Sequence, residues 1–396
     1  MPRVKGRLSA AVVGAGAFGG WTALSLLRRG ARVTLLDAWG PGNPRSSSGG
    51  ESRVIRGLYG GDAIYADWAA LSLARWRAAG RRWGRRFYRK TGGLWMFRGD
   101  DTYARLALPH MKEAGLRIER LPLRVAARRF PQVRFTGVRS VYYEPEAGYL
   151  LAREACRAVA DAVVREGGRY GRAEALPGRI TRGALDGLRL SGGSRLEADA
   201  YVFACGPWLG SLFPGVVGDR VRPTRQEVLF FGAPPGDDRF DADALPVWVD
   251  FGARVVYGIP GHEGRGFKFA DDTRGPEVDP TSLDRAPDPA GIRRARRFLA
   301  ERFPDLAGAP LLESRVCQYE NSPDADFIID RHPGAANTFL VGGGSGHGFK
   351  FGPAVGEHAA ALVMGTGRPN PRFALGRFGR RGARPPVTQF AAGSKA

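Results

Sequence analysis

Cysteine and long apolar runs are scarce in this sequence, and each scarcity excludes a class of protein. The 396 residues contain three cysteines, Cys156, Cys205 and Cys317, and no C-x-x-C spacing. Three widely separated thiols build neither a disulfide framework nor a cysteine-rich metal site, and they suit a reducing compartment. No apolar run is long enough to span a bilayer. We therefore expect a cytoplasmic protein that holds no metal and does not associate with membranes.

The N-terminal segment and the charge invite two other interpretations. Glycines interrupt the first apolar run at once, which favours a strand and its turn over a secretory signal. The formal net charge is +21, a surplus that is common in nucleic-acid-binding proteins. The basic residues, however, are spread along the whole chain, and no DNA- or RNA-binding motif accompanies them. We expect no nucleic-acid partner, and a basic nucleic-acid-associated protein remains the non-enzyme alternative.

Lysine is also rare, because only 6 of the 60 basic residues are lysine and the other 54 are arginine. Where arginine is the default cation, a retained lysine can mark a site that needs a compact ammonium group rather than a planar guanidinium. Lys268 and Lys350 both lie within the apolar phrase Gly-Phe-Lys-Phe. Chance placement explains this pattern equally well, so the pattern alone decides nothing.

The first 40 residues have the pattern of a dinucleotide-binding unit. A strand, a helix and a second strand are predicted over Leu8–Val13, Trp21–Arg29 and Ala31–Leu36. Gly14-Ala-Gly16-Ala-Phe-Gly19 connects the first strand to the helix, and Asp37 lies 18 residues beyond Gly19. In such a unit the glycines admit a pyrophosphate at the helix N-terminus, and the carboxylate accepts hydrogen bonds from a ribose.

Further elements follow from periodicity and from breaker residues. Residues 40–50 are predicted to form a loop, and Arg53 and Arg56 are spaced as on one face of a helix. Helices are predicted over Asp67–Arg86, Ala152–Glu166, Arg285–Phe303 and Pro353–Met364, and strands over Thr91–Phe97, Leu196–Cys205, Leu311–Gln318, Phe327–Asp330 and Thr338–Gly342. A second glycine-rich segment, Gly342–Phe351, follows the last of these strands.

Phrases along nearly the whole chain resemble the monomeric sarcosine oxidase and N-methyltryptophan oxidase family of D-amino-acid-oxidase-like flavoproteins. These phrases are VVGAGAFG, SRVIRGLYG, TGGLWMF, EPEAG, ACGPW, PTRQ, FKF around Lys268, RVCQYE, DFIID and SGHGFKF. The resemblance implies an α/β fold in which a Rossmann-like FAD-binding domain with glutathione-reductase-like topology adjoins an α+β substrate domain on a mainly antiparallel sheet. It places residues 1–88, 150–219 and 323–376 in the FAD-binding domain, residues 89–149 and 220–322 in the substrate domain, and residues 377–396 in a basic, disordered tail.

The resemblance also assigns the cofactor and its ligands. FAD is expected, with Cys317 matching the cysteine that carries the flavin through an 8α-thioether; alternatively Cys317 is a buried structural cysteine. The expected cofactor-binding residues are Gly14, Gly16, Phe18, Gly19, Asp37, Ser46, Ser48, Gly49, Arg53, Ala204, Gly206, Trp208, Cys317, Gly344, Gly346, His347, Gly348, Phe349 and Lys350.

The catalytic and substrate-binding residues are likewise implied by the resemblance. Arg56 and Lys350 match the pair that holds the carboxylate of an amino-acid substrate. Lys268 matches the lysine that helps oxygen react with reduced flavin, and Arg53 matches an arginine beside the ring. The substrate cavity is expected to include Tyr257, Tyr319 and Trp248, of which Tyr257 is also expected at the catalytic centre. For each of these residues the alternative is a salt-bridged or packed side chain.

Several positions depart from the family pattern. Gly49 and Asp272 stand where relatives have histidines, and Gly344 stands where relatives have a bulky aromatic residue. Trp248 occupies a methionine-like cavity position. Loss of two side chains beside the flavin predicts a substrate larger than sarcosine, and the substitution at residue 272 leaves open how the amine is held.

The function expected from the resemblance is FAD-dependent oxidation of a secondary, N-methylated or cyclic amino acid to an imine, with oxygen reduced to hydrogen peroxide. A monomer that acts on a small molecule is expected. One alternative is a biosynthetic desaturase that acts on a bulky ring amine or a carrier-linked amino acid, and another is a dehydrogenase that passes electrons to a partner protein.

Overall fold

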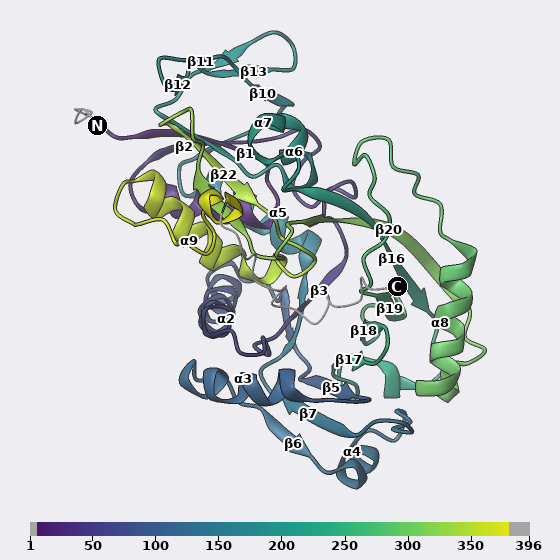
Figure 1. Ribbon diagram of the computed structural model, residues 1–396. Coiled ribbons are helices and arrows are strands. Elements are labelled where there is room, and N and C mark those ends of the chain that lie inside the picture. Colours follow the sequence, from purple (N-terminus) through teal and green to yellow (C-terminus); the bar gives the residue numbers. More distant parts are fainter. Residues whose placement is uncertain (1–5, 380–396) are drawn as a thin grey trace.

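The computed structural model describes residues 6–379, which are arranged around two large β-sheets (Figure 1). The six-stranded sheet has the order β21-β22-β15-β1-β2-β9. Its strands are β1 (Ser9–Val13), β2 (Arg32–Asp37), β9 (Arg169–Arg172), β15 (Ala200–Phe203), β21 (Ile328–Arg331) and β22 (Thr338–Gly342). All neighbouring pairs are parallel except β21 with β22. The carboxyl ends of the parallel strands therefore meet along one edge, where ligands bind in open α/β sheets.

Both faces of the six-stranded sheet are covered, because apolar residues occupy successive positions of its strands. In β1, Ala10 and Val12 belong to a core shared with the helices α1 (Ala17–Arg28), α5 (Ala152–Arg165) and α9 (Gly352–Val363). Ala11 and Val13 belong to a second core on the other face. Helix α1 packs closely on α9, since a Cβ added at Gly356 would lie 2.5 Å from the backbone carbon of Trp21.

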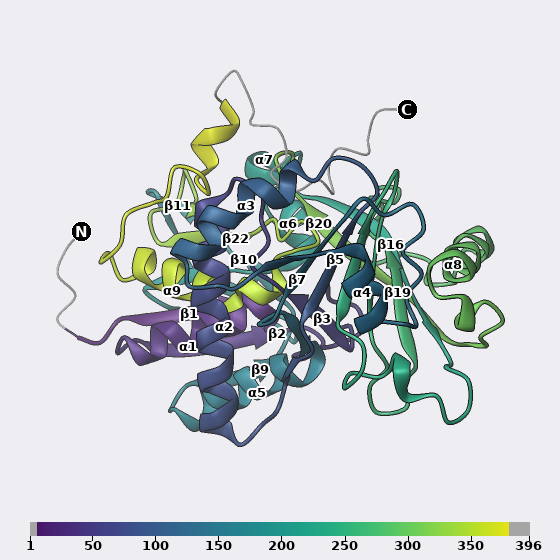
Figure 2. The same cartoon turned by 90° about the horizontal axis from the view of Figure 1, so that it is seen from below.

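The eight-stranded sheet has the order β20-β16-β19-β18-β17-β5-β7-β6 and is antiparallel except between β17 and β5. Its strands are β5 (Gly93–Phe97), β6 (Glu119–Leu121), β7 (Ser140–Glu144), β16 (Arg222–Phe231), β17 (Val247–Phe251), β18 (Val255–Ile259), β19 (Phe267–Asp271) and β20 (Leu311–Asn321). Helix α8 (Pro289–Arg302) runs along the side of this sheet that is remote from β1 and α1 (Figure 2). The buried ion pair between Arg302 Nε and Asp250 Oδ2, at 2.8 Å, ties α8 to β17.

A small sheet of order β3-β8-β4 lies between the two large ones (Figure 1). The remaining helices and strands are α2 (Ala63–Trp83), α3 (Thr102–Glu113), α4 (Leu123–Arg129), α6 (Leu209–Leu212), α7 (Pro214–Val217), β3 (Ser52–Ile55), β4 (Tyr88–Lys90), β8 (Gly148–Leu151), β10 (Ala175–Pro177), β11 (Ile180–Thr181), β12 (Ala184–Leu185), β13 (Leu188–Leu190) and β14 (Arg195–Leu196). Short 3₁₀ helices include η1 (Gly206–Trp208), η4 (Phe349–Phe351) and η5 (Leu375–Gly379). Within residues 6–379, no helix has the length and apolarity needed to cross a bilayer.

Two expectations about local structure are wrong. Ser52–Ile55 is strand β3 and pairs with β8, so Arg53 and Arg56 do not share a helical face. The predicted disorder from Arg377 onward fails for residues 377–379, because Arg377 lies in η5 and its Nε donates to Asp324 Oδ2 at 2.7 Å. The rest of that tail, residues 380–396, lies outside the described residues.

Candidate cofactor and substrate site

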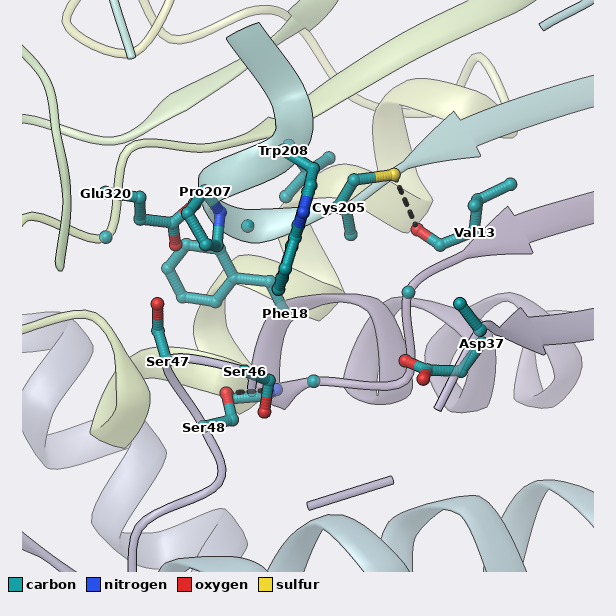
Figure 3. Close-up of a pocket in the computed structure, with 18 of the residues that line it drawn as sticks. Val13, Phe18, Asp37, Ser46, Ser47, Ser48, Cys205, Pro207, Trp208 and Glu320 are labelled. Carbon is teal, nitrogen blue, oxygen red and sulfur yellow. Dashed lines mark hydrogen bonds between the residues drawn. The ribbon is translucent and has the colours of Figure 1, made fainter. Parts of the chain in front are cut away.

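A cavity with a volume of about 190 Å³ opens beside the carboxyl ends of β1, β2 and β15 (Figure 3), and we call it the main cavity because most of the predicted cofactor-binding residues line it. Much of its lining comes from four segments that are distant in the sequence: the β1–α1 turn, the loop of residues 43–48, the turn after β15 and the glycine-rich turn after β22. Residues 37–39, 173–176 and 319–320 also line it. The sequence-predicted residues that line it are Gly14, Gly16, Phe18, Asp37, Ser46, Ser48, Arg53, Ala204, Gly206, Trp208, Tyr319, Gly344, Gly346, Gly348 and Phe349.

The β1–α1 turn is tightly packed against the turn after β15 and against its own backbone. Gly14 has φ +106°, and a Cβ there would lie 2.3 Å from the carbonyl oxygen of Ala204. A Cβ at Gly19 would lie 1.8 Å from the carbonyl oxygen of Gly14, so both positions require glycine. The turn leads directly into α1, whose N-terminal N–H groups and dipole attract a phosphate charge.

Polar side chains hold this turn in place. The N–H of Ala15 donates to Asp37 Oδ2 at 2.8 Å, and the N–H of Ala17 donates to Ser48 Oγ at 3.1 Å. The other carboxylate oxygen of Asp37 accepts hydrogen bonds from the N–H groups of Trp39 and Gly40. Asp37 is thereby fixed at the end of β2, where a carboxylate faces the adenosine ribose of a bound dinucleotide.

A second cavity of about 370 Å³ contains Cys317 and Lys268, and Ser46 and Arg53 line both cavities. The Arg53 guanidinium donates to the Ser47 carbonyl oxygen at 2.7 Å and lies 3.5 Å from Cys317 Sγ. A positive charge at that distance attracts a thiolate, the nucleophilic form of cysteine. The three thiols Cys156, Cys205 and Cys317 are all free. Cys156 also lies near Arg53, and Cys317 is the thiol that lines the second cavity together with Arg53 and Lys268.

Lys268 is 2% exposed and its ammonium donates to the Ser52 carbonyl oxygen at 2.8 Å. Burial, reinforced by the nearby Arg53 guanidinium, holds the pKa of Lys268 well below its ordinary value. Lys268 is therefore a buried amino group with one strong backbone acceptor at the wall of the second cavity.

Arg56 and Lys350 meet at Tyr59. The Arg56 guanidinium carbon lies 4.2 Å from the centre of the Tyr59 ring, and Lys350 Nζ donates to the Tyr59 hydroxyl at 2.8 Å. Lys350 also donates to the His347 carbonyl oxygen at 2.8 Å. Burial, followed by the Arg56 charge, lowers the pKa of Lys350 well below its ordinary value. Two cations so close together form a strong attraction for an anion.

Tyr319 and Asp272 form a further polar pair. The Tyr319 hydroxyl donates to Asp272 Oδ1 at 2.7 Å, and Tyr319 also interacts with the Tyr257 hydroxyl. Burial raises the pKa of Asp272 to about 7, against the opposing effects of the Tyr319 hydrogen bond and the Arg56 charge. Burial raises the pKa of Tyr257 to about 12. Asp272 thus provides a carboxyl group that changes charge near neutral pH.

Comparison with known proteins decides the family. The profile described as FAD dependent oxidoreductase matches residues 9–362. The chain belongs to this FAD-dependent oxidoreductase family. It is 28% identical over 370 residues to monomeric sarcosine oxidase of Bacillus sp. (strain B-0618), covering 90% of this chain and 92% of that protein. It is 30% identical to monomeric sarcosine oxidase of Streptomyces avermitilis, with coverage of 89% and 92%.

Two further comparisons extend this likeness. N-methyl-L-tryptophan oxidase of Salmonella arizonae is 27% identical, with coverage of 89% of this chain and 94% of that protein. L-proline dehydrogenase from P. horikoshii shares the fold, with a TM-score of 0.82, 20% identity and coverage of 94% of this chain and 98% of that one. The predicted family, the α/β fold with its FAD-binding and substrate portions, and the assignment as a flavin-dependent enzyme are confirmed.

The residues of this FAD-dependent oxidoreductase fit the cofactor. At the wall of the cavity, Gly14 lets the β1–α1 turn and the turn after β15 approach each other, since a Cβ there would lie 2.3 Å from the Ala204 carbonyl oxygen. The cavity also holds a buried carboxylate oxygen, Oε2 of Glu320, with no hydrogen-bond partner among the described residues. Among those same residues, no cluster of three or more His, Cys, Asp or Glu side chains is placed to hold a metal ion.

Some predicted residues lie beside the cavities rather than in their walls. His347 is buried, with Nε2 2.9 Å from the Ala325 carbonyl oxygen and Nδ1 3.4 Å from the Tyr59 hydroxyl. Lys350 lies next to it at Tyr59. Gly19 shapes the β1–α1 turn from behind. These residues support the glycine-rich turn after β22 and the start of α1, and their direct contact with FAD stays a prediction.

The structure contradicts the placement of Trp248 in the substrate cavity. Trp248 is fully buried and its ring stacks on Phe267 and Phe298 at 5.7 Å from each. Trp248 pairs with Gly258, whereas Tyr257 pairs with the neighbouring Val249. Because side chains alternate between the faces of a strand, Trp248 points toward α8 and Tyr257 points away from it.

Gly49 and Gly344 leave less room beside the flavin site than the sequence analysis expected. A Cβ at Gly49 would lie 1.7 Å from the Asn43 carbonyl oxygen, so the folded loop itself excludes a side chain there. A Cβ at Gly344 would lie 2.8 Å from Glu320 Oε1, which shows that a carboxyl group already occupies this side of the turn.

Sequence reasoning did not select Tyr59 or Glu320. Tyr59 lies in the phrase SRVIRGLYG, and Glu320 ends RVCQYE, so both stood within matching phrases without an assigned role. The position of Glu320 directly after Tyr319 was the available signal. Its carboxyl group becomes informative only when the turns after β15 and β22 are seen around it.

Proposed function

We propose that this enzyme oxidises a secondary amino acid, N-methylated or cyclic, at a carbon next to nitrogen and passes the electrons to oxygen as hydrogen peroxide. The observation that carries the proposal is the convergence of Arg56 and Lys350 on Tyr59. The names of the relatives, sarcosine oxidase and N-methyl-L-tryptophan oxidase, support a substrate of this class.

Arg56 and Lys350 would hold the substrate carboxylate. An ammonium group has three donors, and two of those of Lys350 are used by the Tyr59 hydroxyl and the His347 carbonyl oxygen. The third can reach an anion. Tyr59 positions both cations: its ring stacks against the Arg56 guanidinium, and its hydroxyl accepts a hydrogen bond from Lys350. A carboxylate is the ligand that best compensates two buried positive charges.

Asp272, Tyr319 and Tyr257 would form the amine end of the substrate site. Asp272 in its charged form attracts an ammonium group and accepts a hydrogen bond from it. Tyr319 orients Asp272 through the 2.7 Å hydrogen bond, and Tyr257 interacts in turn with Tyr319. The distribution of charge, two cations at one end and a carboxylate at the other, matches an amino acid.

FAD supplies the oxidising power when bound, because its ring accepts a hydride equivalent from the substrate and returns the electrons to oxygen. The turn Gly14–Gly19, Asp37, Ser46 and Ser48 would hold its phosphates and ribose, and the turn after β22 would face its ring. Lys268 would place a positive charge where oxygen is reduced, which stabilises negative charge as it develops.

We also propose that Cys317 carries the flavin covalently through a thioether to the 8-methyl carbon. The 3.5 Å contact between its sulfur and the Arg53 guanidinium supports this placement. The sulfur would bond to the 8-methyl carbon, the thiol and that carbon would each lose a proton, and the two electrons would reduce the flavin, which oxygen would then reoxidise. Acid precipitation of the purified protein tests it: the yellow colour should stay with the pellet, and a flavin mass should appear on the peptide containing Cys317. Cys317→Ser is the control, and colour released from the wild-type protein by acid would refute the link.

The assay that tests the function offers the holoenzyme sarcosine, N-methyl-L-tryptophan and L-proline and measures peroxide and oxygen uptake. Peroxide formation with at least one secondary amino acid is expected. Arg56→Gln and Lys350→Met should each weaken use of the acid much more than use of the corresponding amide, which lacks the carboxylate. Equal loss with acid and amide would remove these residues from carboxylate binding. Reduction of the flavin without oxygen uptake would favour a dehydrogenase, and an aromatic product would favour a desaturase.

A further inference from the structure

Glu320 places a carboxyl group in the main cavity, at the end of β20 (Figure 3). The residue is 8% exposed, and Oε2 has no hydrogen-bond partner among the residues that the structure describes. A buried carboxylate oxygen that lacks a donor is costly, since it has lost its hydration without replacement. The atom therefore marks a position at which a donor is missing from the protein itself.

The carboxyl group of Glu320 fits between two glycine turns. A Cβ at Gly344 would lie 2.8 Å from Oε1, and Cβ atoms at Gly342 and Gly206 would lie 3.5 Å and 3.7 Å from Oε2. These glycines belong to the turns after β22 and after β15, both of which line the cavity near Glu320. A side chain at Gly344 would press against Oε1, whereas Cβ atoms at Gly342 and Gly206 would only make van der Waals contact with Oε2. The carboxyl group therefore depends most on the glycine at residue 344.

The position of Glu320 selects one half of the cofactor. In Figure 3, Glu320 lies beside Pro207 and Phe18, on the opposite side of the cavity from Asp37. Asp37 stands at the ribose of the adenosine half, with the helix N-terminus next to the pyrophosphate. Glu320 instead adjoins Tyr319, at the end where the ribityl chain and the flavin ring belong. The donors on that half are the ribityl hydroxyls and the ring N3–H.

We propose that Glu320 is a cofactor-binding residue whose Oε2 accepts a hydrogen bond from the ribityl–flavin half of FAD, so that the charge on Glu320 is part of the flavin environment. The role goes beyond the proposed amine oxidation and holds for any substrate. It assigns a function to the one buried carboxyl group that lines the main cavity beside the two glycine turns.

Among residues 6–379, no cation is paired with the carboxyl group of Glu320. Burial raises the pKa of Glu320 to about 7, and the N–H groups of Gly343 and Gly344 are what favours its charged form. The turn after β15 contributes the Cys205 thiol, and burial raises the pKa of this thiol far above neutral pH. Helix α1 contributes Phe18, which carries no charge. The Tyr319 hydroxyl is committed to Asp272, and the His347 ring to Ala325 and Tyr59. Glu320 is thus the group facing this part of the cavity that titrates near neutral pH.

The test is a pH titration of the visible absorbance of the oxidised holoenzyme, without substrate, between pH 5.5 and 8.5. In the Asp272→Asn background, which removes the other nearby carboxyl group that titrates near 7, the flavin bands should shift through a single protonation with a midpoint near 7, because a new charge beside the flavin alters its absorption. Added to this background, Glu320→Gln should abolish that transition, and Glu320→Thr should abolish it as well with a smaller, neutral side chain. Above the midpoint, both double variants should be reduced more readily than Asp272→Asn alone, since a neighbouring negative charge opposes added electrons.

Two matched variants separate Glu320 from other carboxyl groups. Burial also raises the pKa of Glu144 to about 7, but its oxygens accept hydrogen bonds from Gly57 N–H and Trp95 Nε1 outside the main cavity. Glu144→Gln and Asp272→Asn should therefore keep the Glu320 transition. A wild-type enzyme with no transition would overturn the proposal even if the Glu320 variants did not fold, and so would a transition that survives when Glu320→Gln is added to Asp272→Asn. A changed infrared stretch of the ring carbonyls in that variant would place the bond at N3–H, and an unchanged one at a ribityl hydroxyl.

Discussion

Asp272 is the residue whose chemistry bears most directly on the choice of substrate. A carboxyl group that titrates near pH 7 can attract a charged amine above that pH and loses the attraction below it. Arg56, Arg274 and Tyr319 favour its charged form, and burial opposes them. With these opposing effects, the pKa of Asp272 is about 7, so its change of charge falls within the pH range of an ordinary enzyme assay.

For Asp272→Asn we expect a loss of roughly 10- to 100-fold in kcat/KM above pH 7, because a hydrogen bond to a charged group contributes about 1.5–3 kcal/mol. In the wild type, kcat/KM should fall as the pH drops below about 7, since the carboxylate becomes protonated. In Asp272→Asn, kcat/KM should not show this fall below pH 7, which is the acid limb of the pH profile. Steady-state rates from pH 5.5 to 8.5 measure both effects.

Tyr319→Phe serves as the companion variant. It removes the hydroxyl that donates to the charged form of Asp272, so the limb should move to higher pH while the carboxyl group remains. If Asp272→Asn keeps the limb at its original position, the ionisation belongs to another group and the amine site must be sought elsewhere.

Lys268 offers a second prediction at the level of a single side chain. Lys268→Met keeps the length and removes the charge, so reaction of the reduced enzyme with oxygen should slow by roughly 10²-fold, the usual cost of removing one preorganised charge or donor. Reduction by substrate should change far less. Stopped-flow measurement of the two half-reactions separates them, and equal slowing of both would show that Lys268 acts on the ring or on the fold rather than on oxygen.

Among the secondary-structure elements, the turn between β1 and α1 has the tightest geometry. Gly14→Ala would combine a φ of +106° with a Cβ 2.3 Å from the Ala204 carbonyl oxygen. We expect this variant to lose most of its bound flavin and more than about 2 kcal/mol of stability. The flavin-to-protein absorbance ratio and chemical denaturation provide the measurements.

Gly30→Ala is the matched control, since Gly30 has φ +95° and no atom within 4 Å of the added Cβ. Its cost should be limited to backbone strain of about 1 kcal/mol, with full flavin content. Loss of flavin in both variants alike would mean that general destabilisation, and not distortion of the β1–α1 turn against Ala204, explains the Gly14 result.

The elements also show how far a sequence can be interpreted. The β1–α1–β2 unit was predictable because its glycines, periodicity and Asp37 all belong to one short stretch. The segment with Arg53 and Arg56 was assigned to a helix by mistake. Two arginines three residues apart do not by themselves distinguish a helix from a strand, and only the pairing of Ser52–Ile55 with β8 identifies the strand. Trp248 was misplaced because a one-residue change in register sends a strand residue to the opposite face of the sheet.

At the scale of the whole molecule, the site is assembled from segments separated by more than 250 residues. Arg53 meets Cys317, and Tyr59 meets Lys350, only because β20 and the turn after β22 return to the β1–α1 region. Family resemblance placed Arg53, Cys317 and Lys350 at one flavin site, because it carries long-range information that periodicity cannot supply, but it did not predict either of these two contacts. Tyr59 and Glu320 escaped prediction because their roles depend on neighbours from other parts of the chain.

Buried carboxyl groups make the stability of the whole molecule depend on pH in an unusual direction. Glu144 is 1% exposed, and burial raises its pKa from 4.5 to about 7. A carboxyl group whose pKa is higher in the folded than in the unfolded chain stabilises the fold while protonated. That contribution is complete below the unfolded pKa and is lost as the pH rises through about 7. Asp272 and Glu320 act in the same sense, but they lie at the substrate and cofactor sites.

We therefore expect the free energy of unfolding to contain a term from Glu144 that falls by about 3 kcal/mol between pH 5 and pH 8, at about 1.4 kcal/mol per unit of pKa difference. In Glu144→Gln this term is absent, so the decline across that range should be shallower by a similar amount, whatever the stability of the variant at pH 5. Urea denaturation at intervals of half a pH unit measures both slopes on the holoenzyme. Parallel curves for the two proteins would mean that Glu144 is charged in the folded state at pH 5, with its burial compensated by Gly57, Trp95 and Arg56.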